Sequence, residues 1–205
     1  MGRYKGPAAK VSRNLGVNLT ETPKIDAIMK RRPFASGQHG PTQTHKKISE
    51  FAQQLKEKQR LKMRFGIREK QMRRYYDLAN RSKGNTGTIL LQVLERRLDN
   101  VIFRAGLAET RRQARQMVAH GHFLLNGQRV TVPSILVKDG SVISVRANSV
   151  AFVMRTSETA QAYVAPASWL TVSKETASVR FDRLPEREEL DPNMREQLVV
   201  EYYSR

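Results

Sequence analysis

The chain has no cysteine among its 205 residues, which excludes disulfide bonds and thiolate metal sites. No apolar run is long enough to cross a bilayer, and the first twenty residues are too polar for a secretory signal. These absences predict a soluble intracellular protein with no membrane partner.

Signs of an enzyme are also lacking. Outside residues 91–150 the sequence shows no glycine-rich cofactor loop after a strand, no paired carboxylates in an apolar setting and no nucleophile with a plausible base. Four histidines are present, but no carboxylate stands at ligand spacing from them: His39, His45, His120 and His122. We therefore expect no catalysis, no metal, no other cofactor and no small-molecule substrate.

Acidic residues are few. Lys and Arg number 37 against 19 Asp and Glu, and the resulting net charge of +18 favours a polyanionic partner. Residues 1–90 hold 21 basic and 6 acidic side chains, and residues 91–155 hold 10 and 4. Residues 156–205 hold 6 and 9, and this acidic balance argues against nucleic-acid contact in the last part of the chain.

The most distinctive segment is residues 110–130, where a basic helix runs into a hairpin. Thr110 and Gln113 have the spacing of a capping box, and Gly121 supplies the left-handed residue that ends such a helix. The apolar stripe comprises Ala114, Met117 and Val118, and the neighbouring basic face comprises Arg111, Arg112 and Arg115. Asn126-Gly127 then predicts a two-residue turn between strands. A rigid basic surface of this kind indicates RNA binding.

The order of elements predicts an α+β fold. We expect a helical N-terminal domain, an inserted RNA-binding module of two helices followed by a small antiparallel sheet, and a C-terminal tail that packs back on the helical domain. The boundaries assigned from the sequence are a basic arm over 1–44, a helical domain over 45–90 completed by 156–205, and the module over 91–155.

The arm and the helical domain differ in hydrophobic pattern. The arm shows no sustained period apart from a brief helix capped by Thr22, and its eight basic residues favour ordering on a phosphate backbone. Helices are predicted over about 49–63 and 68–81. In the second of these, Tyr75 and Tyr76 fit a core better than a base-stacking surface.

The module and the tail carry the remaining predicted elements. In chain order these are a long helix over 91–105, the Thr110 helix, the Asn126-Gly127 hairpin, strands at 135–137 and 142–145 joined across Asp139-Gly140, a helix over 149–164 stopped by Pro166, and a strand over the last ten residues.

Several motifs carry a family resemblance. The segment at 90–130 reads LLQVLERRLDNVIFRAGLAETRRQARQMVAHGHFLLNGQRV, and it resembles the RNA-binding module shared by the fourth small-subunit ribosomal protein and several RNA-modifying enzymes. The whole chain resembles the bacterial or plastid family of that ribosomal protein through GRYKGP at 2–7, SGQHG at 36–40, LKEKQRLKMRFGIREKQ at 55–71, KGNTG at 83–87 and EQLVVEYYSR at 196–205.

The resemblance implies a structural ribosomal protein. Such a protein is a primary binder of small-subunit (16S) ribosomal RNA early in assembly, contacts neighbouring ribosomal proteins, and resides on the cytoplasmic ribosome, or in the plastid stroma for an organellar chain. The resemblance also implies that His45, Lys46 and Lys47 line the path by which messenger RNA enters, with a contribution to translational accuracy. Repression of its own messenger is compatible with the same RNA surface. Some members bind zinc through N-terminal cysteines, which this chain lacks.

The candidate RNA-binding residues are basic and come from all three parts. They are Arg3, Lys5, Lys10, Arg13, Arg31, Arg32, Lys46, Lys47, Lys58, Arg60, Lys62, Lys70, Arg73, Arg74, Lys83, Arg111, Arg112, Arg115, His120 and His122. We expect these side chains to neutralise phosphates over a wide footprint, while the shape of the folded RNA provides selectivity.

Two alternatives use the same features. An RNA-modifying enzyme, such as a pseudouridine synthase or a methyltransferase, would need a further catalytic domain. A DNA-binding helix-turn-helix factor would place the Thr110 helix in a major groove, but the hairpin directly after that helix and the basic arm fit folded RNA better. Comparison of binding to duplex DNA and to structured RNA separates these readings.

Overall fold

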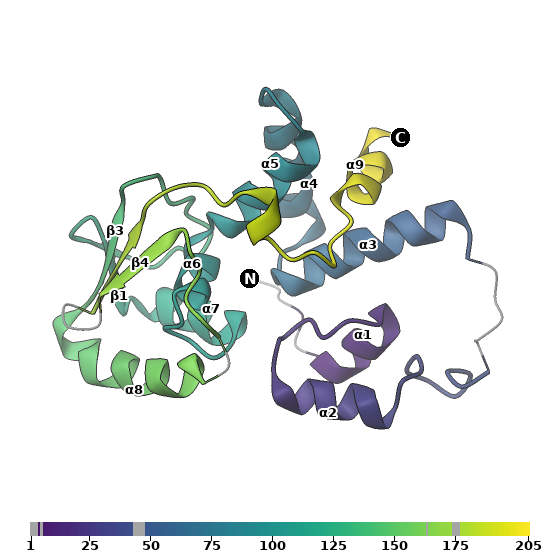
Figure 1. The fold of residues 1–205 in the computed structure, drawn as a ribbon, viewed down its shortest axis with the longest axis horizontal. Helices are drawn as coiled ribbons and strands as arrows, with labels where there is room; N and C mark the ends of the chain where they lie inside the picture. The colour runs from purple at the N-terminus through teal and green to yellow at the C-terminus, as the bar shows by residue number, and fades with distance from the viewer. Residues whose placement is uncertain (1–3, 5, 43–47, 163, 174–176) are drawn as a thin grey trace. The chain divides into compact units, whose positions relative to one another are not determined.

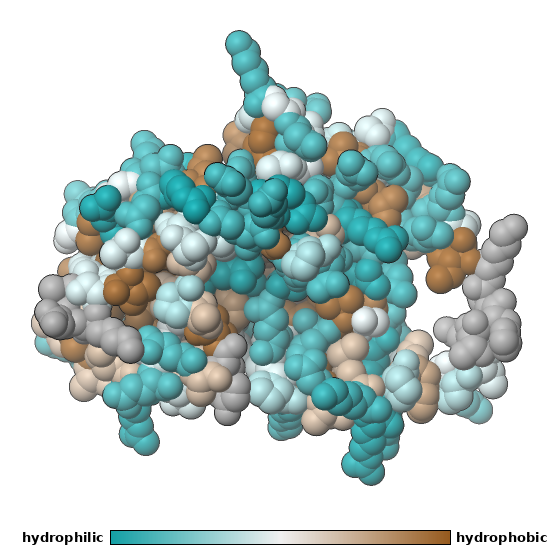
Figure 2. All heavy atoms as spheres, viewed as in Figure 1, coloured by the Kyte–Doolittle hydropathy of each residue, from teal (hydrophilic) through white to brown (hydrophobic). Residues whose placement is uncertain are grey.

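The computed structural model describes residues 4, 6–42, 48–162, 164–173 and 177–205, and it divides the chain into two compact units. Unit 1 comprises Met1–Leu90 and Pro192–Arg205, and unit 2 comprises Leu91–Asp191. Figure 1 shows the ribbon of both units. In Figure 2 hydrophilic side chains cover most of the visible face, with hydrophobic ones in small separate groups. No helix in the described ranges is long and apolar enough to cross a bilayer.

Unit 1 is helical in its described residues. Its helices are α1 (Ala8–Leu15), α2 (Pro23–Arg31), α3 (Glu50–Arg64), α4 (Glu69–Arg81), the first part of α5 (Thr86–Glu95) and α9 (Glu196–Ser204). The hydroxyl of Ser49 accepts the N–H of Ala52 at 3.3 Å and so caps α3 where the sequence predicts a helix start. Tyr75 and Tyr76 of α4 are buried, which confirms that they belong to the core.

The N-terminal arm is more ordered than its sequence predicted. The brief helix after Thr22 is confirmed as α2, but α1 was missed. Leu15, Leu19 and Ile25 are buried, so α1 and α2 contribute to the core of unit 1. Gly16 ends α1 with a φ of 73° and donates its N–H back into the helix.

Nine of the last ten residues form helix α9, and the prediction of a strand there was wrong. Figure 1 shows α9 lying beside α3 and α4. The Tyr203 ring stacks on that of Tyr76 with 5.0 Å between centres, and Gln54 donates to a carboxylate oxygen of Glu201 at 2.9 Å. The apolar residues of this segment fit both the two-residue period of a strand and the roughly 3.6-residue period of a helix. Packing on α3 and α4 selects the helix.

Unit 2 combines helices with one five-stranded antiparallel sheet. Its elements are the end of α5, α6 (Leu98–Arg104), α7 (Arg111–His120), β1 (Phe123–Leu125), β2 (Gln128–Val130), β3 (Val142–Val145), the 3-10 turn η2 (Ala147–Ser149), α8 (Val150–Gln161), β4 (Leu170–Ser173), β5 (Ser178–Phe181) and the 3-10 turn η3 (Arg187–Glu189). The strand order is β2-β1-β3-β5-β4. With the helical unit 1, this sheet confirms the α+β fold class.

The predicted helix over 91–105 is broken into α5 and α6. Arg97 adopts an extended conformation between them, with a ψ of 135°, and forms an isolated antiparallel bridge with Leu136. The N–H of Leu98 donates to the carbonyl of Ile135 at 2.8 Å. The segment 135–137 therefore pairs with the helix break, and the prediction that it forms a strand with 142–145 was wrong.

The tail divides differently from the predicted boundary at residue 156. Strand β5 pairs with β3 through Ile143 and Val179, and β4 pairs with β5, so residues 156–191 belong to unit 2. Only residues 192–205 complete the helical unit. Without the tail, β3 would be an edge strand with unpaired backbone groups. Pairing with β5 satisfies these hydrogen bonds.

Candidate nucleic-acid interface

Helix α7 begins and ends as the sequence predicts. The Thr110 hydroxyl accepts the N–H of Gln113 at 3.2 Å and caps the first turn. The Gln113 side chain accepts the N–H of Glu109 at 2.9 Å, whereas the capping-box prediction gave it the N–H of Thr110. Gly121 ends the helix with a φ of 75°. Hydrogen bonds therefore fix both ends of this basic helix.

The predicted contact residues of α7 differ in exposure. Arg112 is exposed, and so is His120 about two turns further along. Arg111 is only partly exposed, because its Nε donates to Asn100 at 2.8 Å and its guanidinium lies 4.2 Å from the ring centre of Phe103. Of these three side chains, Arg112 and His120 face solvent, whereas Arg111 braces α7 against α6.

Arg115 also faces α6. Its Nη1 lies 3.9 Å from Asp99, whose carboxylate accepts hydrogen bonds from the fully buried Arg97 at 3.0 and 2.6 Å. The expected single free face of Arg111, Arg112 and Arg115 is therefore not formed. The reason is that Asn100 and Phe103 of α6 hold Arg111, and the buried carboxylate of Asp99 attracts Arg115.

A second buried carboxylate, that of Glu95, organises the same helices. Arg104 donates to both of its oxygens at 3.0 and 2.9 Å, and Asn100 also donates to it. Burial alone would raise the pKa of Glu95, but attraction to Arg104 and Arg111, with these hydrogen bonds, holds the pKa below its ordinary value. Glu95 is thus ionised and ties α5, α6 and α7 together.

In unit 1 the exposed candidate residues lie on two groups of helices. They are Lys10 on α1, Arg31 at the end of α2 with Arg32 beside it, Lys70, Arg73 and Arg74 on α4, and Lys83 after α4. Met72 and Ala79 of α4 have no exposed surface, so packing confines Lys70, Arg73 and Arg74 to the opposite face. This face of α4 is a fixed basic surface.

Other candidates of unit 1 have internal partners. Lys58 is 4% exposed, donates to Glu69 at 3.0 Å and lies 4.5 Å from the ring centre of Tyr202. Lys62 donates to the same carboxylate at 3.1 Å. These two lysines therefore join α3 to α4, and Lys58 also holds α9.

Two arginines of the candidate set bind backbone carbonyls. Arg60 donates to the carbonyl of Leu15 at 2.9 and 2.7 Å, which ties α3 to the end of α1. Arg13 donates to the carbonyls of Phe34 and Ala35 at 3.1 and 3.2 Å and holds the segment after α2. The sequence identified both as basic but did not show that they are structural.

Protonation of Glu69 is expected to destabilise unit 1. Burial alone would raise the pKa of this carboxyl, but hydrogen bonds from Tyr203, Lys58 and Lys62 hold the pKa at about 2. An unfolded glutamate titrates near pH ~4.3, so the stabilisation is complete above that pH and is lost as the pH falls toward 2. The free energy of unfolding should fall less steeply with acid in Glu69→Gln than in the unchanged protein. Equal slopes would contradict this role.

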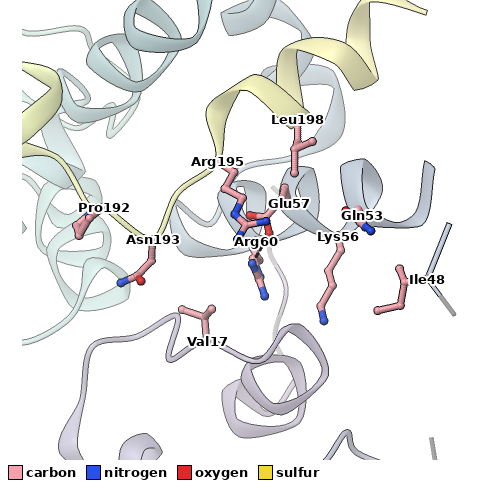
Figure 3. A pocket seen from close by; sticks show the side chains of 10 residues that line it. All are labelled: Val17, Ile48, Gln53, Lys56, Glu57, Arg60, Pro192, Asn193, Arg195 and Leu198. Carbon is pink, nitrogen blue, oxygen red and sulfur yellow. Dashed lines mark hydrogen bonds and ion pairs between the residues drawn. The ribbon is translucent and has the colours of Figure 1, made fainter. Parts of the chain in front are cut away.

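A groove of about 550 Å³ lies between the segment after α1, helix α3 and the C-terminal segment of unit 1 (Figure 3). Lys56 and Arg60 extend from α3 toward the segment that carries Val17, and Arg195 lines the C-terminal side. Glu57 forms an ion pair with Arg60 and offsets part of this charge. The lining of the groove therefore carries a net positive charge.

Four candidates, Arg3, Lys5, Lys46 and Lys47, lie outside the described residues, as does His45. Conversely, unit 2 exposes arginines that the sequence did not single out: Arg129, Arg146 and Arg155, besides Arg180 and Arg183, which form ion pairs with Asp182 and Glu189. Arg129 alternates with apolar Val130 in a predicted strand, and this alternation could have placed it on the outer face of the sheet.

The fold and these surfaces define an RNA-binding protein that carries its basic helix in a small α+β unit. Residues 3–95 match the family described as the ribosomal protein S4/S9 N-terminal domain, and residues 96–143 match the S4 domain. The chain is 48% identical over 208 residues to the small ribosomal subunit protein uS4 of Mycolicibacterium smegmatis. It is 46% identical over 211 residues to those of Gloeobacter violaceus and Aquifex aeolicus, and each alignment covers 100% of both chains.

The chain therefore belongs to the family of the small ribosomal subunit protein uS4. This is a family of structural ribosomal proteins rather than enzymes, as the sequence predicted. Membership also agrees with the predicted location on cytoplasmic ribosomes.

Proposed function

We propose that this chain is a primary binder of small-subunit (16S) ribosomal RNA that acts early in assembly of the subunit. The observation that carries the proposal is a set of exposed basic side chains on helices whose opposite faces are packed: Lys70, Arg73 and Arg74 on α4, and Arg112 with His120 on α7. Phosphate contacts supply affinity, and the fixed pattern of charge matches a folded RNA shape.

The candidate residues divide into two roles under this proposal. Exposed ones contact RNA directly: Lys10, Arg31, Arg32, Lys70, Arg73, Arg74, Lys83, Arg112 and His120. The partly or fully buried ones hold the surface in shape: Arg13, Lys58, Arg60, Lys62, Arg111 and Arg115. His122 is partly exposed, and its Nδ1 lies 2.9 Å from the hydroxyl of Ser149. Units 1 and 2 then serve as two RNA-binding domains, in place of the three segments predicted.

We also propose, from the family resemblance, contacts with proteins and with messenger RNA. The chain contacts neighbouring ribosomal proteins, and His45, Lys46 and Lys47 contribute to the path by which messenger RNA enters and to translational accuracy. Repression of its own messenger would use the same RNA surface. A Lys46→Ala/Lys47→Ala variant tests the messenger role, because it should alter misreading by assembled subunits without weakening their ribosomal RNA binding.

Assembly supplies the direct test of the primary role. The protein, added to protein-free 16S ribosomal RNA, should co-sediment with it at moderate salt and should be needed for later proteins to join. If subunits assemble to the same extent and at the same rate without it, the assembly role is wrong.

A further inference from the structure

Three aromatic rings lie together in unit 2, where α7, η2 and α8 meet. The ring centre of His122 is 5.3 Å from that of Phe152 and 6.1 Å from that of His120. Phe152 is 51% exposed although it is a large apolar side chain, and His120 is exposed as well. The cluster therefore presents ring surface to solvent on both sides of His122.

Local hydrogen bonds hold the central ring in place. His122 Nδ1 lies 2.9 Å from the hydroxyl of Ser149, and the backbone carbonyl of His122 accepts the N–H of Arg146 at 2.9 Å. Phe152 stands in the first turn of α8, directly after η2. The His122 ring thus has a fixed position before any partner binds, which reduces the entropy lost on binding.

The charge around the rings is positive. Arg146 is exposed beside His122, and Arg155 is exposed one helical turn along α8 from Phe152. Arg129 crosses the end of α7, since a Cβ atom on Gly121 would lie 2.6 Å from its Nε. These arginines can hold phosphates next to the rings.

The surroundings of the central histidine favour its neutral form. Burial lowers the pKa of His122, and the neighbouring His120 and Arg146 lower this pKa further. A neutral imidazole can pack against the Phe152 ring and hold it in place without placing a further charge beside it. The rings of His122 and Phe152 are therefore suited to stack on a flat partner rather than to form an ion pair.

We propose that Phe152, supported by His122, is a stacking site for one unpaired RNA base, with Arg146 and Arg155 holding the adjacent phosphates. Unpaired bases are commonly recognised by stacking on aromatic rings set in basic surroundings. The surrounding arginines favour RNA over a protein partner for the exposed ring. This inference rests on the proposed RNA-binding function and adds a contact outside α4 and α7.

Two variants of Phe152 test the site. Phe152→Leu removes the ring, and it should weaken binding to 16S ribosomal RNA by about 5-fold to 150-fold. Phe152→Trp keeps a stacking ring, so it should bind like the unchanged protein, and RNA should quench its indole fluorescence. The native Trp169 is 3% exposed and supplies a constant background.

Phe51 offers a matched control. It is 49% exposed and also has one ring neighbour, Tyr202, at 5.8 Å between centres. Phe51→Leu should leave the affinity unchanged, and RNA should not quench Phe51→Trp. Chemical probing of the bound RNA adds a second readout, because Phe152→Leu should make one unpaired nucleotide reactive while the rest of the footprint remains.

The outcomes separate this inference from the function on which it rests. If RNA binds but Phe152→Leu keeps full affinity and Phe152→Trp is not quenched, the stacking site is wrong and the proposed function stands. If Phe152→Leu binds RNA normally but loses a ribosomal protein neighbour, the exposed ring is a protein contact, which also overturns the site. If the unchanged protein does not bind 16S ribosomal RNA, the proposed function itself fails.

Discussion

Arg97→Ala should lower the free energy of unfolding of unit 2 by about 3–5 kcal/mol, because it leaves the buried carboxylate of Asp99 without its main partner. Arg97 has no exposed surface and donates to both oxygens of Asp99, at 3.0 and 2.6 Å. Arg115 lies 3.9 Å from the same carboxylate and is too far away to replace both hydrogen bonds. The measurement is urea unfolding followed by the fluorescence of Trp169, a residue of unit 2.

The matched control is Arg112→Ala, which removes an exposed arginine from the neighbouring helix. Its free energy of unfolding should stay within about 0.5 kcal/mol of that of the unchanged protein. Asp99→Leu combined with Arg97→Met should recover much of the stability, since an apolar pair can replace a buried ion pair. A loss below about 1 kcal/mol for Arg97→Ala would show that the ion pair does not organise the break between α5 and α6.

Replacing Lys70, Arg73 and Arg74 together with alanine should weaken 16S ribosomal RNA binding on the order of tenfold to a hundredfold at moderate salt. Each lost phosphate contact reduces the slope of log affinity against log salt by about 0.7 to 0.9, so three contacts reduce it by roughly 2 to 3. Because these side chains lie on the face of α4 opposite its buried residues, the fold should be unaffected. Filter binding over a salt series measures both quantities.

A control with the same loss of charge uses arginines of residues 178–189. Arg180 and Arg183 are paired with Asp182 and Glu189, at 2.7 and 2.5 Å, in an acidic part of the chain. Replacing Arg180, Arg183 and Arg187 with alanine should change the slope by less than about 1, because Asp182 and Glu189 already neutralise Arg180 and Arg183. If both triple variants lose affinity equally, net charge rather than the position of the cations governs binding.

The sequence predicted best those elements that local chemistry determines. The caps of α7 at Thr110 and Gly121 appear where their residue types require them. Asn126 and Gly127 adopt φ values of 49° and 81°, as a tight hairpin turn needs, and β1 pairs with β2 across them. In α4 the helical spacing of apolar residues correctly separated the buried tyrosines from the exposed cations.

Elements that depend on distant partners were predicted poorly. The helical state of α9 follows from packing against α3 and α4, more than a hundred residues earlier in the chain. The break at Arg97 follows from its pairing with Leu136, and the sheet gains β4 and β5 from residues assigned to the helical domain. Periodicity within a short window carries no information about such partners.

In the candidate interface too, local sequence predicted some features, and others depend on distant partners. Residue type identified the cations, but only the fold distinguishes exposed Arg112 from Arg111 and Arg115, which brace the helix. The stacking candidate Phe152 stands next to His122 because the chain returns to His122 just before η2, where the N–H of Arg146 donates to the carbonyl of His122. Neither distinction follows from spacing along the chain.

Competition binding tests the central claim most directly. Labelled 16S ribosomal RNA is bound to the protein and challenged with unlabelled 16S ribosomal RNA, with heparin or with an unrelated structured RNA of equal length, over a series of salt concentrations. Non-specific binding rests on phosphate contacts alone and weakens steeply with salt, so the preference for the ribosomal RNA should persist at moderate salt. Equal displacement by all three polyanions at every salt concentration would contradict the claim that folded helices hold the cations in a pattern matched to one RNA.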